Sequence, residues 1–369
     1  MSQMKIESFI PSMIEQKASD LHLRPASPPV VRVDGRLVSL AFNHLTPEDT
    51  RIIAEEMMNE TQRQKFIARR ECDLALNIGE FGRFRVNIYQ QRGMVNLALR
   101  RVPDQIPKFA DLHLPAVLTK ISENQRGLVL VTGTTGSGKS TTLAAIVDYI
   151  NENRSVNIIT IEDPIEYIHR DKKSIVNQRE LGFDTLSYQE ALRNVVRQDP
   201  DVILVGEMRD LETMAAALTA AQTGHLVLST IHTIDAIQTV SRVVDLFPPY
   251  QQGQIRYQLA DTLKAVISQR LLPQATGQGR VPAVEILINT PLVKKYIEEN
   301  NLAEITNLMR QGSFYGMQTF NQSLLHLYEK KEIKLEDALQ AASNPEELML
   351  AVRGIESGTS SRDIIDRSF

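Results

Sequence analysis

The sequence contains almost no cysteine and no tryptophan. Its one cysteine, Cys72, has no second cysteine to pair with, so an intrachain disulfide is excluded. No cluster of cysteine and histidine residues has the spacing of a zinc site. This usage is typical of proteins in a reducing compartment, and we expect a cytoplasmic location.

The sequence also lacks a large excess of positive or of negative charge. The 41 basic and 45 acidic residues leave a formal net charge of −4, which supplies no positive field over the whole surface. A protein whose main task is to grip nucleic acid is therefore disfavoured, and we expect no stable nucleic-acid complex. The charged share of 23% and the hydrophobic share of 42% exclude disorder, collagen and coiled coil as descriptions of the whole chain.

The sequence also lacks a hydrophobic run that indicates a signal peptide or a membrane span. Charged side chains interrupt the N-terminal stretch at Lys5, Glu7, Glu15 and Lys17. Residues 213–234 carry no charge, but the polar run Gln222-Thr223-Gly224-His225 lies in their middle and disfavours insertion. We interpret this run as a helix end followed by a buried strand, and we expect no transmembrane segment.

A chain of 369 residues is long enough for two or three domains. Short apolar runs that alternate with turns indicate a small α+β domain first, and prolines then punctuate a segment without periodicity. The last residues are rich in serine, glycine and charge, and we expect them to be mobile. The expected parts are an N-terminal domain at 1–105, a linker at 106–117, a core at 118–289, a helical region at 290–353 and a tail at 354–369.

Local signals predict elements in the N-terminal domain. Asp34-Gly35 between two apolar runs predicts a β-hairpin. Helical patterns flank it near residues 3–17 and 47–68, and the second opens with Thr46 as a cap and Pro47 in the first turn.

The pattern after residue 126 is that of an α/β fold. Strands that are apolar on both faces and separated by helical segments predict a parallel sheet with helices packed on it. One of these helices opens with a capping-box pattern from Ser187 to Glu190. From about residue 290, starting at Thr290-Pro291, the pattern is helical only. The predicted strands are 128–132, 156–161, 202–205 and 226–230.

The strongest motif lies directly after the first of these strands, and Thr141 opens a helical pattern directly after it. In such a loop, glycines let backbone N–H groups surround phosphate oxygens, Lys139 neutralises the β and γ phosphates, and the Ser140 hydroxyl binds Mg²⁺. We therefore predict a nucleotide site made by Gly133, Thr134, Thr135, Gly136, Ser137, Gly138, Lys139, Ser140 and Thr141.

Hydrolysis also needs a carboxylate at the C-terminal ends of neighbouring strands. Glu207 follows the strand at 202–205, and three further acids follow the strand that ends at Ile161. Such a carboxylate accepts the proton of the attacking water or holds Mg²⁺, and the alternative is a helix cap or a surface loop. The three acids are Glu162, Asp163 and Glu166.

Two histidines bracket the fourth strand. His225 precedes it and His232 follows it. Either one alone is more often a packed, hydrogen-bonded histidine than a catalytic one. At the end of a strand near the nucleotide, however, a neutral His232 imidazole can both donate and accept a hydrogen bond, which suits a sensor of the γ phosphate.

An acid-free stretch between Glu80 and Asp104 forms a local positive field. The first interpretation is a solvated strand face. The second is a set of guanidinium groups that neutralise charge on a phosphoryl group bound by a neighbouring subunit. A nucleic-acid patch is the third. The arginines concerned are Arg83, Arg85, Arg92, Arg100 and Arg101.

Together these motifs resemble the Walker A, Asp box, Walker B and His box of secretion-type ATPases. Two further strings, at 19–23 and 316–324, are similar to the PilT/PilU family of type IV pilus retraction ATPases. The resemblance implies a PAS-like N-terminal domain and a RecA-like ATPase domain with a helical C-terminal portion. It implies catalysis by Glu166 and Glu207 and an approach of N-terminal arginines, Arg83 and Arg85 among them, to the site.

The resemblance also implies partners. They are further subunits, in a homohexamer or a mixed hexamer with a related retraction ATPase, and the platform protein at the inner face of the inner membrane. One departure concerns the surface helix at 292–299, where the second arginine of the PilT motif is replaced by the acid Glu298. We expect Lys294 to pair with Glu298 four residues on, and the change favours a PilU-like or divergent PilT paralogue.

Two alternatives to a Mg²⁺-dependent ATPase motor stay open at this point. A nucleic-acid translocase is disfavoured by the acidic balance and the lack of aromatic residues in a basic groove. A regulatory ring subunit with little turnover is disfavoured by the intact motif residues. The guanine motif Asn-Lys-x-Asp and the string Leu-Ser-Gly-Gly-Gln, expected of a GTPase and of an ABC protein, do not occur.

Overall fold

The computed structural model describes residues 5–33 and 35–355. The chain divides into two compact units, of which the first comprises Met1–Gln105 with Glu166–Ile168 and the second comprises Ile106–Ile165 with His169–Phe369. Most of the tail that the sequence predicts to be mobile, and Asp34 of the predicted hairpin, lie outside the described residues.

The first unit is built on an antiparallel sheet in the order β3-β2-β1-β6-β5-β4. One face carries the core, in which Leu21, Val86 and Leu99 pack with Ile53 of helix α2 (Pro47–Met57). The predicted hairpin is confirmed by the pairing of Val33 with Arg36. The strands are β1 (Asp20–Leu23), β2 (Val30–Val33), β3 (Arg36–Ser39), β4 (Glu71–Asn77), β5 (Arg83–Gln91) and β6 (Met94–Arg101).

The helical pattern at 47–68 forms two helices instead of one. Met58 has an extended backbone, with ψ of 134°, and ends α2. The Asn59 side chain then accepts a hydrogen bond from the backbone N–H of Gln62, whose side chain accepts one from Asn59 in return. This capping box gives α3 its own start, which periodicity does not reveal. The helical elements of the unit are η1 (Ile6–Ser8), α1 (Ile10–Glu15), α2 (Pro47–Met57), α3 (Glu60–Arg69) and η2 (Gly79–Phe81).

The second unit is built on a seven-stranded sheet in the order β13-β12-β7-β11-β10-β8-β9. All neighbouring strands run parallel except the antiparallel pair of β12 and β13. The four predicted strands are confirmed, whereas β9, β12 and β13 are additional. The strands are β7 (Gly127–Thr132), β8 (Asn157–Glu162), β9 (Ile175–Glu180), β10 (Val202–Val205), β11 (Leu226–Ile231), β12 (Leu263–Pro273) and β13 (Arg280–Ile288).

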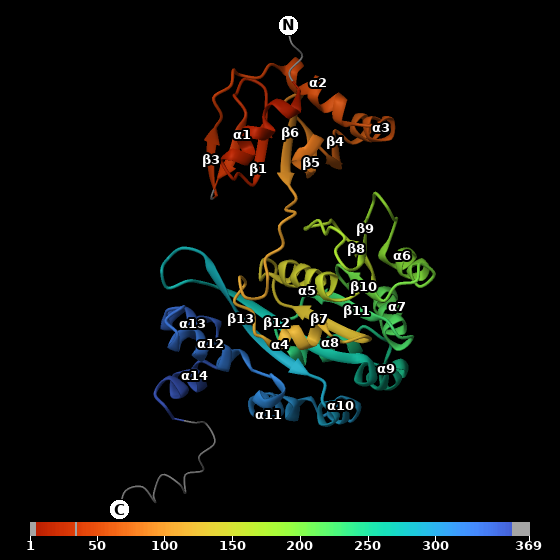
Figure 1. The fold of residues 1–369 in the computed structure, drawn as a ribbon, viewed down its shortest axis with the longest axis vertical. Coiled ribbons are helices and arrows are strands. Elements are labelled where there is room, and N and C mark those ends of the chain that lie inside the picture. The colour runs from red at the N-terminus through yellow and green to blue at the C-terminus, as the bar shows by residue number, and fades with distance from the viewer. Residues whose placement is uncertain (1–4, 34, 356–369) are drawn as a thin grey trace, which may run out of the picture. The chain divides into compact units, whose positions relative to one another are not determined.

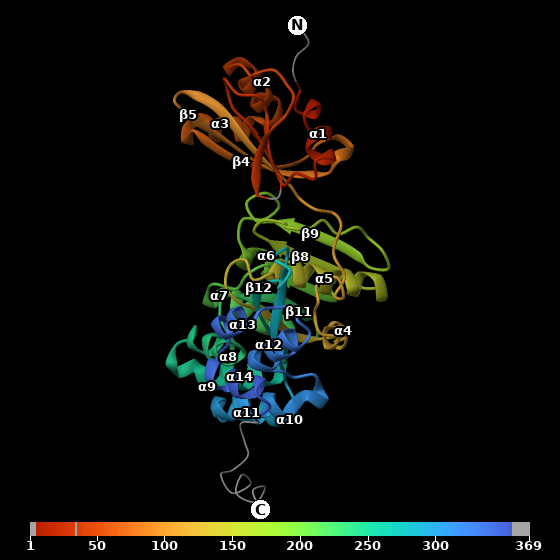
Figure 2. The ribbon, with the colours of Figure 1, turned by 90° about the vertical axis from the view of Figure 1, so that its left-hand side faces the viewer.

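Helices cover both faces of this sheet (Figures 1 and 2). Along β7, Leu128 and Leu130 pack on one face, whereas Val129 and Val131 pack on the other. The first face meets α6 (Tyr188–Val195), α7 (Leu211–Gln222), α8 (Ala236–Asp245) and α9 (Pro249–Thr262), and the second meets α4 (Val117–Ser122) and α5 (Lys139–Asn153). Because both faces are buried, the strands contain few polar residues and their register is closely specified.

The segment at 106–117, expected to be a linker, lies in the second unit. Leu114 is buried there in the same cluster as Ile146 of α5, and the rings of Phe109 and Tyr149 lie 5.7 Å apart. The prolines of this segment prevent a helical pattern in the sequence, but its apolar side chains still pack in the cluster that contains α5.

The region after residue 290 is helical, as the sequence predicts, and Thr290 caps the first helix. Lys294, however, pairs with Asp261 of α9 at 2.8 Å, so the expected pairing with Glu298 is wrong. The reason is that α10 packs against α9, which brings a second acid closer. The helical elements are α10 (Pro291–Glu298), α11 (Leu302–Gln311), η3 (Gly312–Tyr315), α12 (Phe320–Glu329), α13 (Leu335–Ala341) and α14 (Pro345–Val352).

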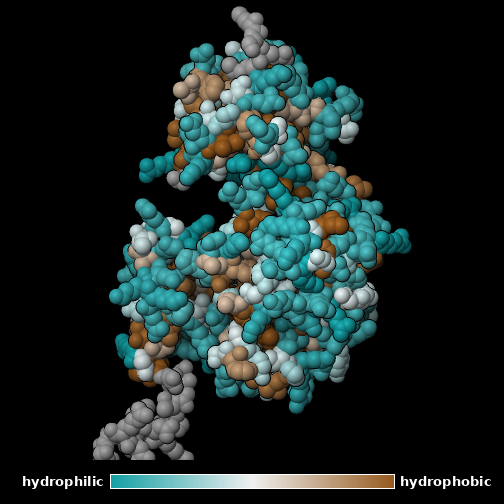
Figure 3. Space-filling view, viewed as in Figure 1, coloured by the Kyte–Doolittle hydropathy of each residue, from teal (hydrophilic) through white to brown (hydrophobic). Residues whose placement is uncertain are grey.

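The surface carries no continuous apolar belt on the face that Figure 3 shows, where hydrophobic residues form separate patches among hydrophilic ones. Within residues 5–33 and 35–355, no helix combines the length and the apolar character that crossing a bilayer requires.

Candidate active site

The predicted nucleotide loop connects β7 to α5. Gly133 has a φ of 140°, and a Cβ atom at this position would lie 2.5 Å from both the Gln269 carbonyl oxygen and the Ser137 hydroxyl. Only glycine fits there. The buried Lys139 ammonium donates hydrogen bonds of 2.9 Å to the carbonyl oxygens of Gly133 and Thr134. The loop therefore closes around the amine, with Gly138 at φ 93° directly before the helix.

Strand β12 anchors this loop from the side. The Thr132 hydroxyl donates to the Ser268 hydroxyl at 2.8 Å, and the Gln269 amide donates to the Thr142 hydroxyl at 2.8 Å. Gln269 is only 2% exposed. Neither Ser268 nor Gln269 is among the residues predicted from the sequence, because the run 263–273 also contains Lys264 and Arg270 and so gives no clear signal for a polar pair.

The parallel register brings the carboxyl ends of four strands to one edge of the sheet. Lys139 and Ser140 follow β7, His232 follows β11, Glu207 follows β10, and Glu162 ends β8. In a parallel sheet this edge is where ligands bind. Predicted residues as far apart in the chain as Lys139 and His232 therefore share one site region.

Glu207 lies at the centre of a charged cluster on this edge. Its carboxylate pairs with His232 Nε2 at 3.1 Å and with Arg209 Nη2 at 2.7 Å. Burial raises the pKa of Glu207, but the hydrogen bond from Arg209 and the charges of His232 and Arg209 outweigh it and leave the pKa below its usual value. Glu207 is therefore an ionised carboxylate at neutral pH.

Hydroxyl groups of β11 hold the backbone that carries Glu207. Ser229 donates to the Val205 carbonyl at 2.6 Å and Thr230 donates to the Gly206 carbonyl at 2.7 Å. The Gly206 N–H also donates to the Ile161 carbonyl of β8 at 2.8 Å. Serine and threonine in the middle of a buried strand thus fix the end of β10 from one side, while β8 fixes it from the other.

A tyrosine that the sequence analysis missed lies beside this cluster. The Tyr188 hydroxyl would lie 2.9 Å from a Cβ atom at Gly206, so it faces the end of β10. Burial and the carboxylates of Asp163, Glu207 and Glu162 raise the pKa of this hydroxyl, which stays protonated. Tyr188 is the first residue of α6 and follows the cap Ser187, which accepts a bond from Glu190 N–H at 3.1 Å.

The two bracketing histidines differ in role. His225 Nδ1 lies 2.9 Å from the Ala220 carbonyl and 3.2 Å from the Thr223 hydroxyl, at the end of α7 and before β11 starts. It therefore closes a helix end, whereas His232 lies at the opposite end of the strand beside Glu207.

The predicted arginines and Glu166 belong to the first unit. Arg85 lies directly opposite Arg100 in the sheet, on the face away from the core. Arg100 pairs with Asp20 at 2.7 Å, and Arg83 lies two residues before Arg85 on the same strand face. Further predicted residues are Arg92 in the β5–β6 turn at φ 50°, Arg101, which pairs with Asp104 at 3.9 Å, and the exposed Glu166 in the segment 166–168.

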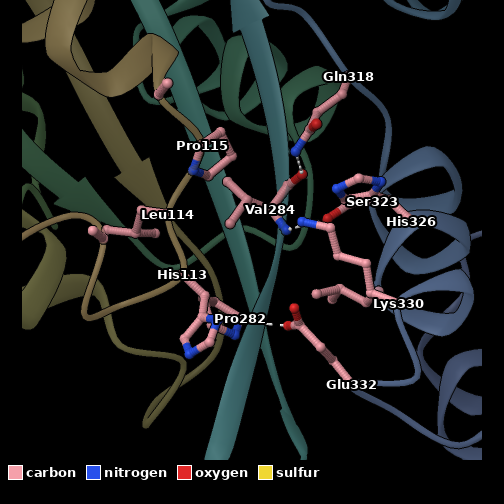
Figure 4. A pocket seen from close by; sticks show the side chains of 13 residues that line it. His113, Leu114, Pro115, Pro282, Val284, Gln318, Ser323, His326, Lys330 and Glu332 are labelled. Carbon is pink, nitrogen blue, oxygen red and sulfur yellow. Dashed lines mark hydrogen bonds and ion pairs between the residues drawn. The ribbon is translucent and has the colours of Figure 1, made fainter.

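A separate cavity of about 340 Å³ in the second unit contains none of the predicted site residues. It lies between the segment before α4, strand β13 and helix α12 (Figure 4). His113 Nδ1 lies 3.6 Å from the Glu332 carboxylate across it. Ser323 and Gln318 bind the backbone of Val284 at 3.0 and 2.7 Å, so the polar lining mostly serves to fix β13.

The donor set at the sheet edge suits Mg²⁺, which binds oxygen atoms of one or two carboxylates or hydroxyls together with substrate phosphates. The Ser140 hydroxyl and the Glu207 carboxylate supply such oxygens. In the part of the chain that the structure describes, no group of three or more His, Cys, Asp and Glu side chains is arranged to hold a metal ion alone.

Known proteins match the chain over most of its length. The family model for type II/IV secretion system proteins matches residues 2–344. The type IV pilus ATPase PilU of Pseudomonas aeruginosa is 43% identical over 355 residues, which cover 96% of this chain and 93% of PilU. The type IV pilus retraction ATPase PilT of the same organism is 44% identical over 343 residues, which cover 93% of this chain and 99% of PilT.

A solved structure shares the fold. The crystal structure of the pilus retraction motor PilT with bound ADP matches with a TM-score of 0.88 and 50% identity, covering 94% of this chain and 99% of that one. The match confirms the predicted α/β class, with an N-terminal sheet domain, a larger parallel-sheet ATPase domain and C-terminal helices.

We expect Gly133→Ala to abolish nucleotide binding, because the added methyl group collides with Gln269 and Ser137 and forces the loop open. The measurement is equilibrium titration with a fluorescent ATP analogue. Gly253→Ala in α9, where a Cβ atom meets nothing within 4 Å, is the control and should bind as the parent does. Unchanged affinity of Gly133→Ala would contradict the assignment of this loop to phosphate.

Proposed function

Because the chain belongs to the family of type II/IV secretion system proteins, together with the pilus ATPases PilT and PilU, we propose that it hydrolyses ATP to drive retraction of a type IV pilus. The relatives are named ATPases, and this chain is an ATPase as well. Twitching motility is the process to which a relative from Neisseria gonorrhoeae is assigned by name, and it is the process we propose here.

The observation that carries the proposal is the Glu207–His232 pair at the edge of the sheet where the nucleotide loop also ends. A carboxylate 3.1 Å from an imidazole and 2.7 Å from a guanidinium keeps its charge in a half-buried place. A charged carboxylate beside a phosphate site either accepts the proton of the attacking water or helps to hold Mg²⁺. Both roles require the negative charge.

The remaining residues of the second unit take supporting roles. Lys139 neutralises charge on the β and γ phosphates, and the backbone of residues 133–138 surrounds the phosphate oxygens. Bound Mg²⁺, with the Ser140 hydroxyl among its ligands, would neutralise negative charge on the phosphate oxygens. His232 holds Glu207 in place and offers a second hydrogen-bonding nitrogen to the terminal phosphate.

Residues of the first unit are proposed to complete the site across a subunit boundary. The resemblance to the family assigns catalysis to Glu166 in addition to Glu207. Arg83 and Arg85 lie with Arg100 on one face of the antiparallel sheet, and a guanidinium group reaching a neighbour's phosphates would stabilise the transferring phosphoryl group. A ring of six such chains, alone or mixed with a related retraction ATPase, supplies the neighbours.

The proposed place of action is the cytoplasmic side of the inner membrane, against the platform protein of the pilus machine. A nucleic-acid translocase is the less favoured alternative, because the formal net charge of −4 supplies no positive field over the whole surface. A ring subunit with little turnover is disfavoured by the intact Lys139, Glu207 and His232.

We expect Glu207→Gln to bind ATP but to lose about 10²- to 10⁴-fold in turnover, because the amide keeps the shape of the side chain but not its charge. Lys139→Ala should lose turnover and also bind ATP more weakly, because it removes a cation that contacts phosphate. Steady-state ATPase assays and nucleotide titrations on both variants provide the comparison. Equal loss of binding and turnover in Glu207→Gln would assign this residue to metal capture or structure instead.

The pH dependence of turnover should depend on the contact between Arg209 and Glu207. Arg209→Ala removes a hydrogen bond and a positive charge that lower the pKa of Glu207, so this pKa rises and the acid limb of the rate profile moves to higher pH. Arg193→Ala on the surface of α6 removes the same charge elsewhere and serves as the control. An Arg209→Ala rate that drops equally at every pH would show that Glu207 titration does not limit the reaction.

Mixed assemblies test the action of the arginines between subunits. Lys139→Ala subunits and Arg83→Ala or Arg85→Ala subunits are each expected to be inactive alone. When they are combined, partial activity should return at interfaces where an intact nucleotide loop meets an intact arginine. If mixed assemblies form but stay inactive at every ratio, the arginines do not act across the boundary.

A further inference from the structure

Glu285 on β13 is a buried carboxylate that the proposed mechanism does not use. It is 7% exposed. Its two oxygens bind two different helices: Oε1 accepts the backbone N–H of Ala236 at 2.9 Å, and Oε2 accepts the backbone N–H of Phe320 at 3.4 Å. Both N–H groups belong to first residues of helices, where the backbone has donors without helical partners and a partial positive charge.

The first of these helices, α8, is attached to the site. It starts four residues after His232, and hydrogen bonds tie the intervening loop to it. The Thr239 hydroxyl donates to the Asp235 carbonyl at 2.7 Å, and the Thr233 and Thr239 hydroxyls lie 2.7 Å apart. Hydrogen bonds therefore hold the start of α8 and the loop that carries His232 together.

The second helix, α12, opens the C-terminal helical region. Phe320 is fully buried in the cluster that joins α12, α13 and α14 to the ends of β12 and β13. The Arg270 guanidinium lies 3.8 Å from the centre of the Phe320 ring and donates to the Ala341 carbonyl at the end of α13. A displacement of Phe320 would therefore also displace the helices that pack with α12.

A buried carboxylate is a costly way to fill this space, because burying charge disfavours folding unless partners compensate. Burial and the charge of Asp235 raise the pKa of Glu285 to about 7, although the backbone N–H groups of Ala236 and Phe320 and the charge of Arg270 act in the opposite direction. An apolar side chain of similar volume would avoid this cost. It would leave the first N–H groups of both helices without their acceptor.

Strand pairing also connects the position of Glu285 with the nucleotide loop. Glu285 is paired with Ser268 on β12, and Ser268 is paired with Thr132 on β7, directly before Gly133. These three residues share one row and one face of the sheet. The backbone that carries Glu285 is therefore in register with the start of the loop.

From this geometry we propose that Glu285 is a positioning residue that couples the His232–Glu207 pair to the C-terminal helical region by holding the starts of α8 and α12 with a single carboxylate. The proposal rests on the proposed function in one respect, namely that His232 and Glu207 serve ATP hydrolysis. The link between the two helices does not depend on it.

The link is tested by hydrogen exchange on the full-length protein. In Glu285→Gln the side chain keeps one acceptor oxygen and turns an amide N–H toward the other helix, so exchange should become faster in the first turns of both α8 and α12. Glu332→Gln, the same change in the same region but without a contact to either helix start, should leave both unchanged. Faster exchange in only one helix, or in neither, would overturn the link.

The coupling to the site is tested by kinetics. Glu285→Gln should lower kcat about tenfold while KM stays within about twofold of the parent value, because the nucleotide loop is intact and only the placement of His232 changes. The same substitution in a His232→Ala background should have no further effect on kcat. Equal losses in both backgrounds would show a role in stability alone and would overturn the coupling.

A second variant and a measurement on the parent protein distinguish the possible outcomes. Glu285→Asp keeps the charge but is one methylene too short to reach both helices, and it should reproduce both results if the Gln variant does not fold. If the parent protein shows no ATP turnover, the proposed function fails, and the exchange experiment still decides whether Glu285 joins the two helices.

Discussion

The parallel pairing of β7, β11, β10 and β8 is the constraint on which the site depends. Each strand is buried on both faces, so its backbone groups find partners only in the neighbouring strands and its register cannot slip without exposing apolar side chains. Four carboxyl ends then meet at one edge. The nucleotide loop, His232, Glu207 and Glu162 occupy that edge because the hydrogen-bond ladder places them there.

Polar residues inside the sheet refine what the ladder provides. Ser229 and Thr230 hold the end of β10, and Ser268 and Gln269 hold the start and the flank of the nucleotide loop. Each of these side chains is buried and uses its hydrogen bond to fix a backbone or side-chain position within the site. The rigidity of the site therefore comes from a few hydroxyl and amide groups in strands that are otherwise apolar.

Two carboxylates of the second unit show how environment decides the state of a glutamate. Burial raises the pKa of Glu207, but the interactions with Arg209 and His232 outweigh burial and leave the pKa below its usual value. Glu285 is almost fully buried and accepts hydrogen bonds from two backbone N–H groups, and burial together with the charge of Asp235 raises its pKa to about 7. The first residue is suited to chemistry that needs a charge, and the second to holding two helices.

The sequence by itself determined the α/β class, four of the strands, the motif loop and the candidate residues that follow each strand, because apolar runs, glycine spacing and caps are local signals. It could not determine that residues 47–68 form two helices, that Lys294 pairs with Asp261, or that β12 and β13 extend the sheet. Periodicity does not reveal the local cap of Asn59 and Gln62 that divides residues 47–68, and the other two features depend on which residues are adjacent after packing. Arg209 and Tyr188 at Glu207, and Glu285 between two helix starts 84 residues apart, were decided only by the tertiary structure. Arg209 is only two residues from Glu207, but their contact depends on the conformation of a loop without a periodic pattern. The packed sheet brings Tyr188 to the end of β10 and Glu285 to both helix starts.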